Sequence, residues 1–261
     1  MMYQFCAKTD AGRVRENNED SVAFDEATNL AVLADGMGGY NAGEIASGMA
    51  TVFIKTELGR WLSEAGQDAR AREVRRAMEI CVDNANLAIF NAASSNAHYA
   101  GMGTTLVVGV FREDTLLVGH IGDSRCYRLR GGVLEQITRD HSLLQEQIDA
   151  GLISPEQAMT SSIRNLVTRA LGVDDTVLLD IHEHLVAAGD IYLMCSDGLS
   201  DMVDDAAIAR IVAAPMELDQ KASQLIDAAN ENGGRDNISV LMVEVGESAE
   251  KRGLIARLLG K

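Results

Sequence analysis

The chain has 261 residues, of which 47% are hydrophobic, so it is long and apolar enough to bury the core of one large domain. Its formal net charge of −16 argues against a nucleic-acid partner, because such partners are bound by clustered Lys and Arg. No stretch approaches the roughly 18 uncharged apolar residues of a membrane span, which argues against a membrane-spanning protein.

Short apolar runs and segments of helical spacing follow one another along the chain. Seven runs have the composition of β-strands and end at Gly, Asp or Asn in most cases, namely 3–9, 30–35, 104–111, 115–122, 124–129, 190–196 and 238–245. Four segments place Ala, Leu, Ile and Met at helical spacing, namely 41–62, 68–96, 205–213 and 218–230.

The spacing of these elements predicts the fold class. Only a few residues separate 104–111 from 115–122, too few for a parallel crossover, so hairpins and antiparallel pairing are expected. The helices come in blocks rather than after each strand. The pattern is typical of an α+β fold in which helices cover antiparallel sheets.

Residues 140–170 are predicted to form a helical excursion between strands. Long insertions beside functional strand ends often act as lids, although a plain surface connection fits this pattern equally well.

Several acidic residues stand at turns or strand ends, namely Glu19, Asp20, Asp35, Asp123, Asp197 and Asp236. Each alone fits an ordinary turn, because Asp bonds its own backbone and Gly accepts unusual dihedral angles. If the strand ends converge, however, the carboxylates would repel one another unless cations lay between them. Oxygen-only ligands favour Mg²⁺, Mn²⁺ or Ca²⁺ over zinc, and Gly36 leaves its carbonyl accessible to such an ion.

Other known chemistries leave signatures that this sequence lacks. It contains no GxxxxGK[ST] phosphate loop, no GxSxG elbow and no HExxH zinc helix. Its four cysteines lie far apart and form no CxxC pair, which argues against zinc ligation and against a disulfide framework. We therefore expect free thiols in a reducing, cytoplasmic compartment.

The motifs, in their order, resemble those of the metal-dependent serine/threonine protein phosphatases of type 2C, the PPM family. The resemblance covers nearly the whole chain through eight blocks, "VRENNEDS", "VLADGMGG", "GMGTTLVV", "VGHIGDSRCYRLR", "LEQITRDHSLL", "NLVTRALG", "MCSDGLSD" and "GGRDNISVLMV". It implies two packed antiparallel β-sheets flanked by α-helical layers, with the metal site at one end of the sandwich. The short single-domain form is similar to bacterial members.

The resemblance also implies roles for individual residues. Asp35 would bridge two Mn²⁺ or Mg²⁺ ions, and Asp197 and Asp236 would complete one site. Glu19, Asp20 and the Gly36 carbonyl would serve the other site, partly through water. Asp123, with Asp197, would hold a third and weaker metal ion. Arg15 would bind the substrate phosphate, which suits a guanidinium facing a tetrahedral dianion.

The implied reaction is direct attack of a metal-activated water on phosphorus in phosphoserine or phosphothreonine of a protein substrate. A bacterial Ser/Thr kinase would supply that substrate, and a monomer is expected. The resemblance divides the chain into a phosphatase domain over 1–246, with a flap insertion at 142–170, and a short basic tail over 247–261. The tail either contacts a partner or an anionic surface, or packs on its own domain.

One position departs from the family pattern. Members often have a histidine near the first Asp-Gly as proton donor to the leaving group, and here Met37 and Tyr40 occupy those positions. Tyr40 is the candidate replacement, with ordinary packing as its other interpretation. Because the histidine is missing, a second hypothesis stays open, in which the chain is a weakly active or inactive phosphatase-fold module that binds phosphoproteins. A calcium-binding structural domain is less consistent with the sequence, because no EF-hand loop is present.

Overall fold

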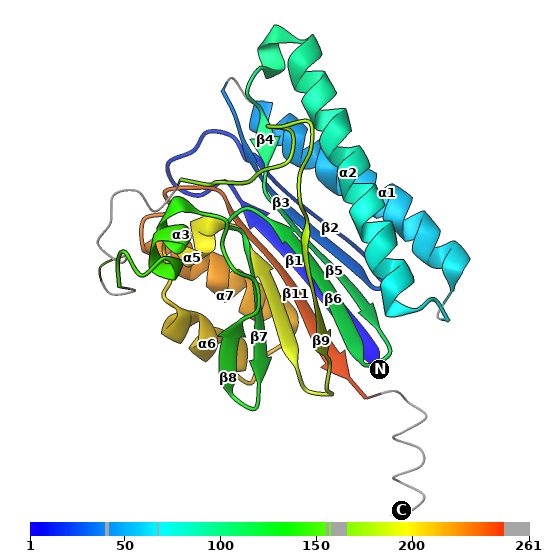
Figure 1. Cartoon of the computed structure of the whole chain (residues 1–261). Helices are drawn as coiled ribbons and strands as arrows, with labels where there is room; N and C mark the ends of the chain where they lie inside the picture. Colours follow the sequence, from blue (N-terminus) through cyan, green and yellow to red (C-terminus); the bar gives the residue numbers. More distant parts are fainter. Residues whose placement is uncertain (40–41, 67, 155–156, 158–165, 248–261) are drawn as a thin grey trace, which may run out of the picture.

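The fold is built around two antiparallel β-sheets that pack face to face (Figure 1). The computed structural model describes residues 1–39, 42–66, 68–154, 157 and 166–247. The first sheet has the strand order β1 (Met2–Asp10), β11 (Ile238–Gly246), β10 (Ile191–Cys195), β7 (Arg125–Arg130) and β8 (Val133–Gln136). The second has the order β2 (Asp20–Asp25), β3 (Leu30–Met37), β5 (Leu106–Arg112), β6 (Thr115–Ile121) and β9 (Asp180–Leu185), and β4 (Gly103–Thr104) pairs with β3.

The strand β3 shows why the central strands read as continuous apolar runs. Ala31 and Leu33 point into the core between the two sheets, whereas Leu30, Val32 and Ala34 point to the opposite face. Side chains alternate between the faces of a strand, so a strand that is covered on both faces needs apolar residues at every position.

Aromatic residues fill much of the space between the sheets. Phe111 and Tyr192, from different sheets, meet edge to face with ring centroids 5.3 Å apart. Phe5 contacts Phe111 in a similar geometry at 6.1 Å. Such pairs each contribute about 0.5–1.5 kcal/mol beyond the area that they bury.

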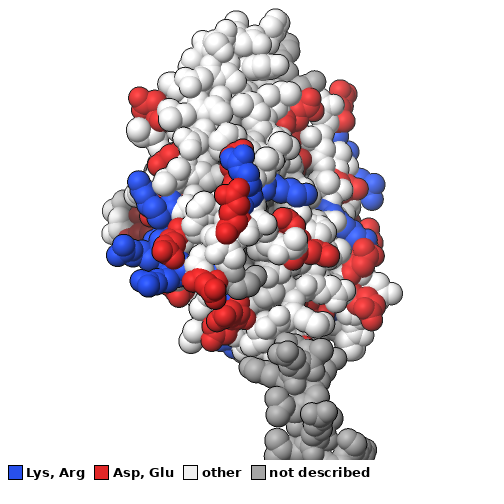
Figure 2. All heavy atoms as spheres, turned by 90° about the vertical axis from the view of Figure 1, so that its right-hand side faces the viewer, with Lys and Arg blue, Asp and Glu red and all other residues white. Residues whose placement is uncertain are grey.

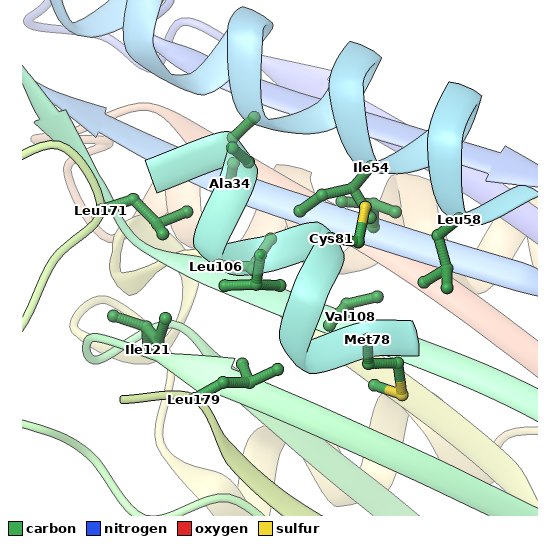
Figure 3. Packing of buried hydrophobic residues seen from close by; sticks show 14 of the residues in the cluster. Ala34, Ile54, Leu58, Met78, Cys81, Leu106, Val108, Ile121, Leu171 and Leu179 are labelled. Carbon is green, nitrogen blue, oxygen red and sulfur yellow. The ribbon is translucent and has the colours of Figure 1, made fainter. Parts of the chain in front are cut away.

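Helices cover the outer face of each sheet. The long helices α1 (Ala42–Ala65) and α2 (Ala71–Ser95) pack on the second sheet, where Ile54, Leu58 and Met78 meet Leu106 and Val108 (Figure 3). The helices α5 (Asp197–Ser200), α6 (Asp205–Ala213) and α7 (Leu218–Glu231) cover the first sheet. The predicted α+β sandwich with flanking helical layers is confirmed.

Three strands that the sequence prediction missed, β2, β8 and β9, lie at sheet edges. A fourth, the two-residue β4, was not distinguished from the predicted run 104–111. An edge strand has one neighbour and tolerates charged residues, so its sequence shows a weaker apolar pattern. The short helix α5 was also missed, because four residues are too few for a visible helical period.

A short 3₁₀ turn (Ala97–Tyr99) follows α2. The expected excursion at 140–170 begins with α3 (Leu143–Asp149). Residues 155–156 and 158–165 of the excursion lie outside the described residues. Its two ends meet, because Ser142 and Val167 form an antiparallel bridge.

None of the helices in the described part of the chain combines the length and apolar composition that a membrane crossing requires.

Figure 2 shows the face of the molecule that lies on the right in Figure 1. Lys and Arg residues on this face are interspersed with Asp and Glu. Side chains of both signs thus lie close together on this face.

Candidate metal centre

The acidic strand ends converge at one end of the sandwich. Asp20 on β2 lies opposite Asp35 on β3 in the strand register. Asp123 follows β6, Asp197 begins α5 directly after β10, and Asp236 precedes β11. The two sheets therefore bring together carboxylates that are up to about two hundred residues apart in the chain.

A cavity of about 330 Å³ lies at this point. Six of the seven predicted metal ligands line it, together with the predicted phosphate-binding arginine; these residues are Arg15, Glu19, Asp35, Gly36, Asp123, Asp197 and Asp236. Met37, Thr105 and Val167 also contribute to its wall. The seventh predicted ligand, Asp20, does not line the cavity.

Asp20 lies beside Asp35, its cross-strand neighbour. Its Oδ2 accepts a hydrogen bond of 2.8 Å from the Ser196 hydroxyl. Its Oδ1 is buried and accepts no hydrogen bond from the part of the chain that the structure describes. A buried carboxylate oxygen without a partner is costly, so this atom favours a cation or a bound water nearby.

The clustering raises the pKa of several of these groups. Burial, followed by the charges of the neighbouring aspartates, holds the pKa of Asp35 and of Asp197 well above the usual range. Burial raises the pKa of Asp20 and of Asp123 to about 6. Burial also raises the pKa of Glu19, although the nearby Arg15 lowers it. The cavity is therefore short of positive charge.

Arg15 provides a cation at the edge of this cluster. Its Nη2 lies 2.7 Å from Asp236 Oδ2, and its side chain remains 54% exposed. The hydrogen bond and charge of Asp236 raise the pKa of Arg15 further. A half-exposed guanidinium at a cavity rim can exchange this carboxylate for an incoming anion.

Backbone contacts hold the carboxylates in place, and the sequence analysis did not single out the residues that make them. Thr105 Oγ1 accepts a hydrogen bond of 3.0 Å from the Asp35 N–H, and the Thr104 hydroxyl donates to the Asp35 carbonyl at 2.9 Å. Asn237 Oδ1 accepts a hydrogen bond of 2.8 Å from the Glu19 N–H. Only their positions in the sequence could have pointed to them: Thr104 and Thr105 lie in the motif "GMGTT", and Asn237 directly follows Asp236.

Close packing also requires a glycine at position 36, in addition to the accessible carbonyl. A Cβ at this position would lie 2.2 Å from the Gly43 carbonyl oxygen and 2.5 Å from the Glu19 carbonyl oxygen. The absence of a side chain therefore lets α1 begin against β3, and Glu19 accepts a backbone hydrogen bond from Gly43 in the first turn of that helix. A helix N-terminus stabilises such a carboxylate.

A larger cavity, of about 750 Å³, lies between α1 and α2, around Phe53 and Trp61. Its charged residues include the neighbouring ion pairs Arg60–Glu57 and Arg76–Glu79 on the helix surfaces. It shares no lining residue with the carboxylate cavity. Its groups offer no evident chemistry, so size alone is a poor guide to the reactive site here.

Tyr40, the candidate proton donor, lies outside the described residues, and the sequence prediction for it stays a prediction. Met37, at the other position where the family pattern has a histidine, lines the cavity. A thioether neither donates nor accepts a proton at ordinary pH, so Met37 cannot replace the histidine as an acid.

The chain is a phosphatase of the metal-dependent class. Its two-sheet sandwich lies between helical layers, its carboxylate centre lies at the end of the sheets, and an arginine lies at the rim of that centre. The sequence model of the family described as protein phosphatase 2C matches residues 11–231. The chain belongs to this family.

Related proteins support the same assignment. The serine/threonine phosphatase stp of Listeria innocua is 38% identical over 244 residues, which cover 91% of this chain and 94% of that protein. The crystal structure of the Mycobacterium tuberculosis serine/threonine phosphatase PstP/Ppp matches with a TM-score of 0.86 and 38% identity, over 95% of this chain and 100% of that chain. The catalytic domain of PstP in complex with two manganese ions matches with a TM-score of 0.80 and 38% identity, over 94% and 99% of the two chains.

Proposed function

We propose that this chain is a metal-dependent protein serine/threonine phosphatase that hydrolyses phosphoserine and phosphothreonine in proteins. The observation that supports this function most strongly is the shared cavity of Glu19, Asp35, Asp123, Asp197 and Asp236 with Arg15 at its rim. Carboxylates fit a metal, and a guanidinium fits the phosphate of the substrate.

The residues of the cavity fit two Mn²⁺ or Mg²⁺ ions and a third, weaker one. All the candidate donors are oxygens, which these hard cations prefer. Asp35 would bridge two ions, Asp197 and Asp236 would complete one site, and Glu19, Asp20 and the Gly36 carbonyl would serve the other. Asp123, with Asp197, would hold the third ion. The raised pKa of Asp35 and the unpartnered Oδ1 of Asp20 support this assignment, because a cation relieves both. Bound ions would activate water and neutralise charge on the phosphate.

The protein residues around the ions position the reactants. Thr104 and Thr105 hold the Asp35 backbone, and Ser196 holds the Asp20 carboxylate, so the protein itself positions these two ligands. Arg15 would leave Asp236 and bind two oxygens of the phosphate, which would orient the phosphorus toward the cavity.

The biological setting that we propose follows from this reaction. Phosphorylated proteins would be the substrates, and a Ser/Thr kinase would produce them. Cys6, Cys81, Cys126 and Cys195 are all free thiols, which supports the reducing cytoplasm as the compartment. We propose a monomer in which residues 1–246 form the phosphatase domain, with the flap at 142–170. Residues 248–261 of the basic tail lie outside the described residues.

A second candidate function is a phosphoprotein-binding module with little or no turnover. Met37 at the cavity wall favours it, because the family position for a proton-donating histidine has no acid there. General acid catalysis contributes about 10²- to 10⁴-fold, so its loss would slow but not abolish hydrolysis. All the carboxylate positions of the family pattern are present in this chain, which favours an active phosphatase over a binding module.

The deciding experiment measures phosphate release from a phosphothreonine peptide by the purified protein. It is run with Mn²⁺, with Mg²⁺ and with excess EDTA, and with the Asp35→Asn variant as control. Release that needs the metal and disappears in the variant supports the phosphatase. No release above the variant, with metal binding seen by calorimetry, favours the binding module. Turnover with Mn²⁺ or Mg²⁺ would also exclude a calcium-binding structural domain.

A further inference from the structure

Two histidines and an aspartate form a second polar cluster, outside the cavity. His120 on β6 stacks on His141, with ring centroids 4.6 Å apart and ring planes 17° from parallel. Asp180 on β9 accepts a hydrogen bond from His141, with 2.9 Å between Nε2 and Oδ2. Both histidines are buried, and ligand atoms of the three residues lie within 4.8 Å of one another.

The hydrogen bonds of His141 argue against a metal in this cluster. The Gly122 N–H donates to His141 Nδ1 at 3.1 Å, so Nδ1 must be unprotonated. The single proton of the neutral ring then lies on Nε2, where Asp180 accepts it at 2.9 Å; Arg169 Nη1 lies farther from Nε2, at 3.4 Å, and the guanidinium only donates. No lone pair of His141 remains for a metal, and the nearly parallel rings would direct their lone pairs along different planes.

These contacts join the two ends of the flap segment, which we define as residues 142–170. The Thr168 N–H donates to the His141 carbonyl at 2.8 Å, and the His141 N–H donates to the Gly122 carbonyl at 2.9 Å. Arg169 Nη1 lies 3.6 Å from Asp180 Oδ1. His141 therefore binds Gly122 through both its backbone and its ring, at the point where the flap segment leaves and rejoins the fold.

Gly122 in turn positions the turn that presents Asp123. Its φ is +99°, and a Cβ there would lie 2.7 Å from the side chain of Thr105. Thr105 Oγ1 lies 2.8 Å from the Ser124 hydroxyl and accepts the Asp35 N–H. The turn 122–124 is thus held between His141 on one side and Thr105 on the other. Asp123, in its middle, lines the cavity.

We propose that His141 is a positioning residue of this phosphatase, which holds the Asp123 carboxylate in the cavity through its ring contact with the Gly122 N–H. The proposal rests on the proposed function, in which Asp123 helps to hold the weakest metal ion. Groups behind metal ligands typically change metal affinity or activity by about 10- to 100-fold when they are removed. Loss of the Gly122 contact should therefore weaken the binding of that ion by about 10- to 100-fold.

Two substitutions separate the ring's hydrogen bond with Gly122 from its hydrogen bond with Asp180. His141→Asn places an amide oxygen near the position of Nδ1 and can still accept from Gly122, but it cannot reach Asp180. His141→Gln places an amide nitrogen near the position of Nε2 and can still donate to Asp180, but it lacks the acceptor for Gly122. His141→Ala removes both contacts. His98→Asn, at an exposed histidine, is the matched control.

The measurement is Mn²⁺ binding by calorimetry, together with the Mn²⁺ concentration that gives half-maximal phosphate release. We expect both to shift by about 10-fold or more in His141→Gln and His141→Ala, with kcat recovering at high Mn²⁺. His141→Asn and His98→Asn should stay close to the wild type. Equal shifts in the Asn and Gln variants, or an unchanged Mn²⁺ titration in His141→Ala, would overturn the proposal.

A second readout keeps the test valid if a buried substitution prevents folding. In Asp180→Asn, His141 itself is untouched, and the substituted residue is only part-buried. Loss of the negative acceptor makes Nδ1 less basic, so the Gly122 amide proton should move upfield in the NMR spectrum and Mn²⁺ should bind more weakly. No change in either would contradict the proposal. Calorimetric Mn²⁺ binding and the NMR shift need no turnover, so they distinguish failure of this proposal from failure of the proposed function.

Discussion

Arg15 Nη2 and Asp236 Oδ2 lie 2.7 Å apart, so the proposed phosphate ligand is paired with a proposed metal ligand. Both residues line the same cavity. A metal ion on Asp236 would compete with Arg15 for the carboxylate and would release the guanidinium toward the substrate. Metal binding would then precede efficient binding of phosphate.

The first prediction tests Arg15. We expect Arg15→Ala to lower kcat/KM for a phosphothreonine peptide by about 10- to 100-fold, because a hydrogen bond to a charged group contributes about 1.5–3 kcal/mol. Steady-state kinetics at saturating Mn²⁺ measure the effect. Arg13→Ala is the matched control, since Arg13 is an exposed arginine of the same loop. Similar losses in both variants would indicate a general charge effect rather than a phosphate contact.

The second prediction concerns the pH dependence of stability without metal. The pKa of Asp20 and of Asp123 is about 6 in the fold, above the ordinary value of 3.8. A carboxyl with a raised pKa favours folding while it is protonated, so this contribution is complete below about pH 4 and is lost as the pH rises through about pH 6. The free energy of unfolding in EDTA should therefore fall across this interval.

Asp20→Asn isolates this effect. The amide stays neutral, so the variant should be more stable than the wild type in EDTA at about pH 7, by on the order of 1 kcal/mol or more. The advantage should disappear at about pH 4. Asp83→Asn, at an exposed position on α2, serves as control. Urea unfolding at the two pH values measures both variants, and an advantage that does not depend on pH would contradict the assignment.

The third prediction concerns metal binding and stability. Mn²⁺ at about 100 times its dissociation constant should raise the free energy of unfolding by about 2.7 kcal/mol, because the ion binds only the folded chain. Asp35→Asn should lose most of this gain, since Asp35 is the proposed bridging ligand. Thermal unfolding with Mn²⁺ and with EDTA measures the difference. A full Mn²⁺ effect in Asp35→Asn would remove Asp35 from the ligand set.

The fourth prediction concerns the missing proton donor. Tyr40→His should raise phosphopeptide hydrolysis, by up to about 10²-fold. It should change hydrolysis of an aryl phosphate much less, because a phenolate leaves with little need for protonation. The ratio of kcat/KM for the two substrates is the quantity to measure. An equal effect on both would refute the proton-donor role of this position.

The fifth prediction concerns the domain boundary. A chain that ends at residue 246 should keep its phosphatase activity and its unfolding temperature, because β11 ends at Gly246 opposite Met2 and completes the first sheet. Activity assays and thermal unfolding of the truncated chain test the proposal. A clear loss of either would assign residues 247–261 to the domain or to its function.

The predicted strands and helices of the core agree with the structure because both faces of each central element are buried. Runs such as 104–111 and 238–245 have nearly unbroken apolar sequences, which are typical of strands that are covered on both faces. The edge strands β2, β8 and β9 were missed because solvent on one side permits polar residues.

Local pattern and motif order were enough for the fold class, for six of the seven predicted metal ligands that line the cavity and for Arg15, since each depends on residue type and spacing. The contacts that hold the site depend on which distant segments meet, and no local pattern contains that information. Thr105 beneath Asp35, Ser196 on Asp20 and His141 on Gly122 became visible only once the sheets were packed. Tertiary structure also decided that Arg15 pairs with Asp236, because their 221-residue separation closes only when β1 lies beside β11.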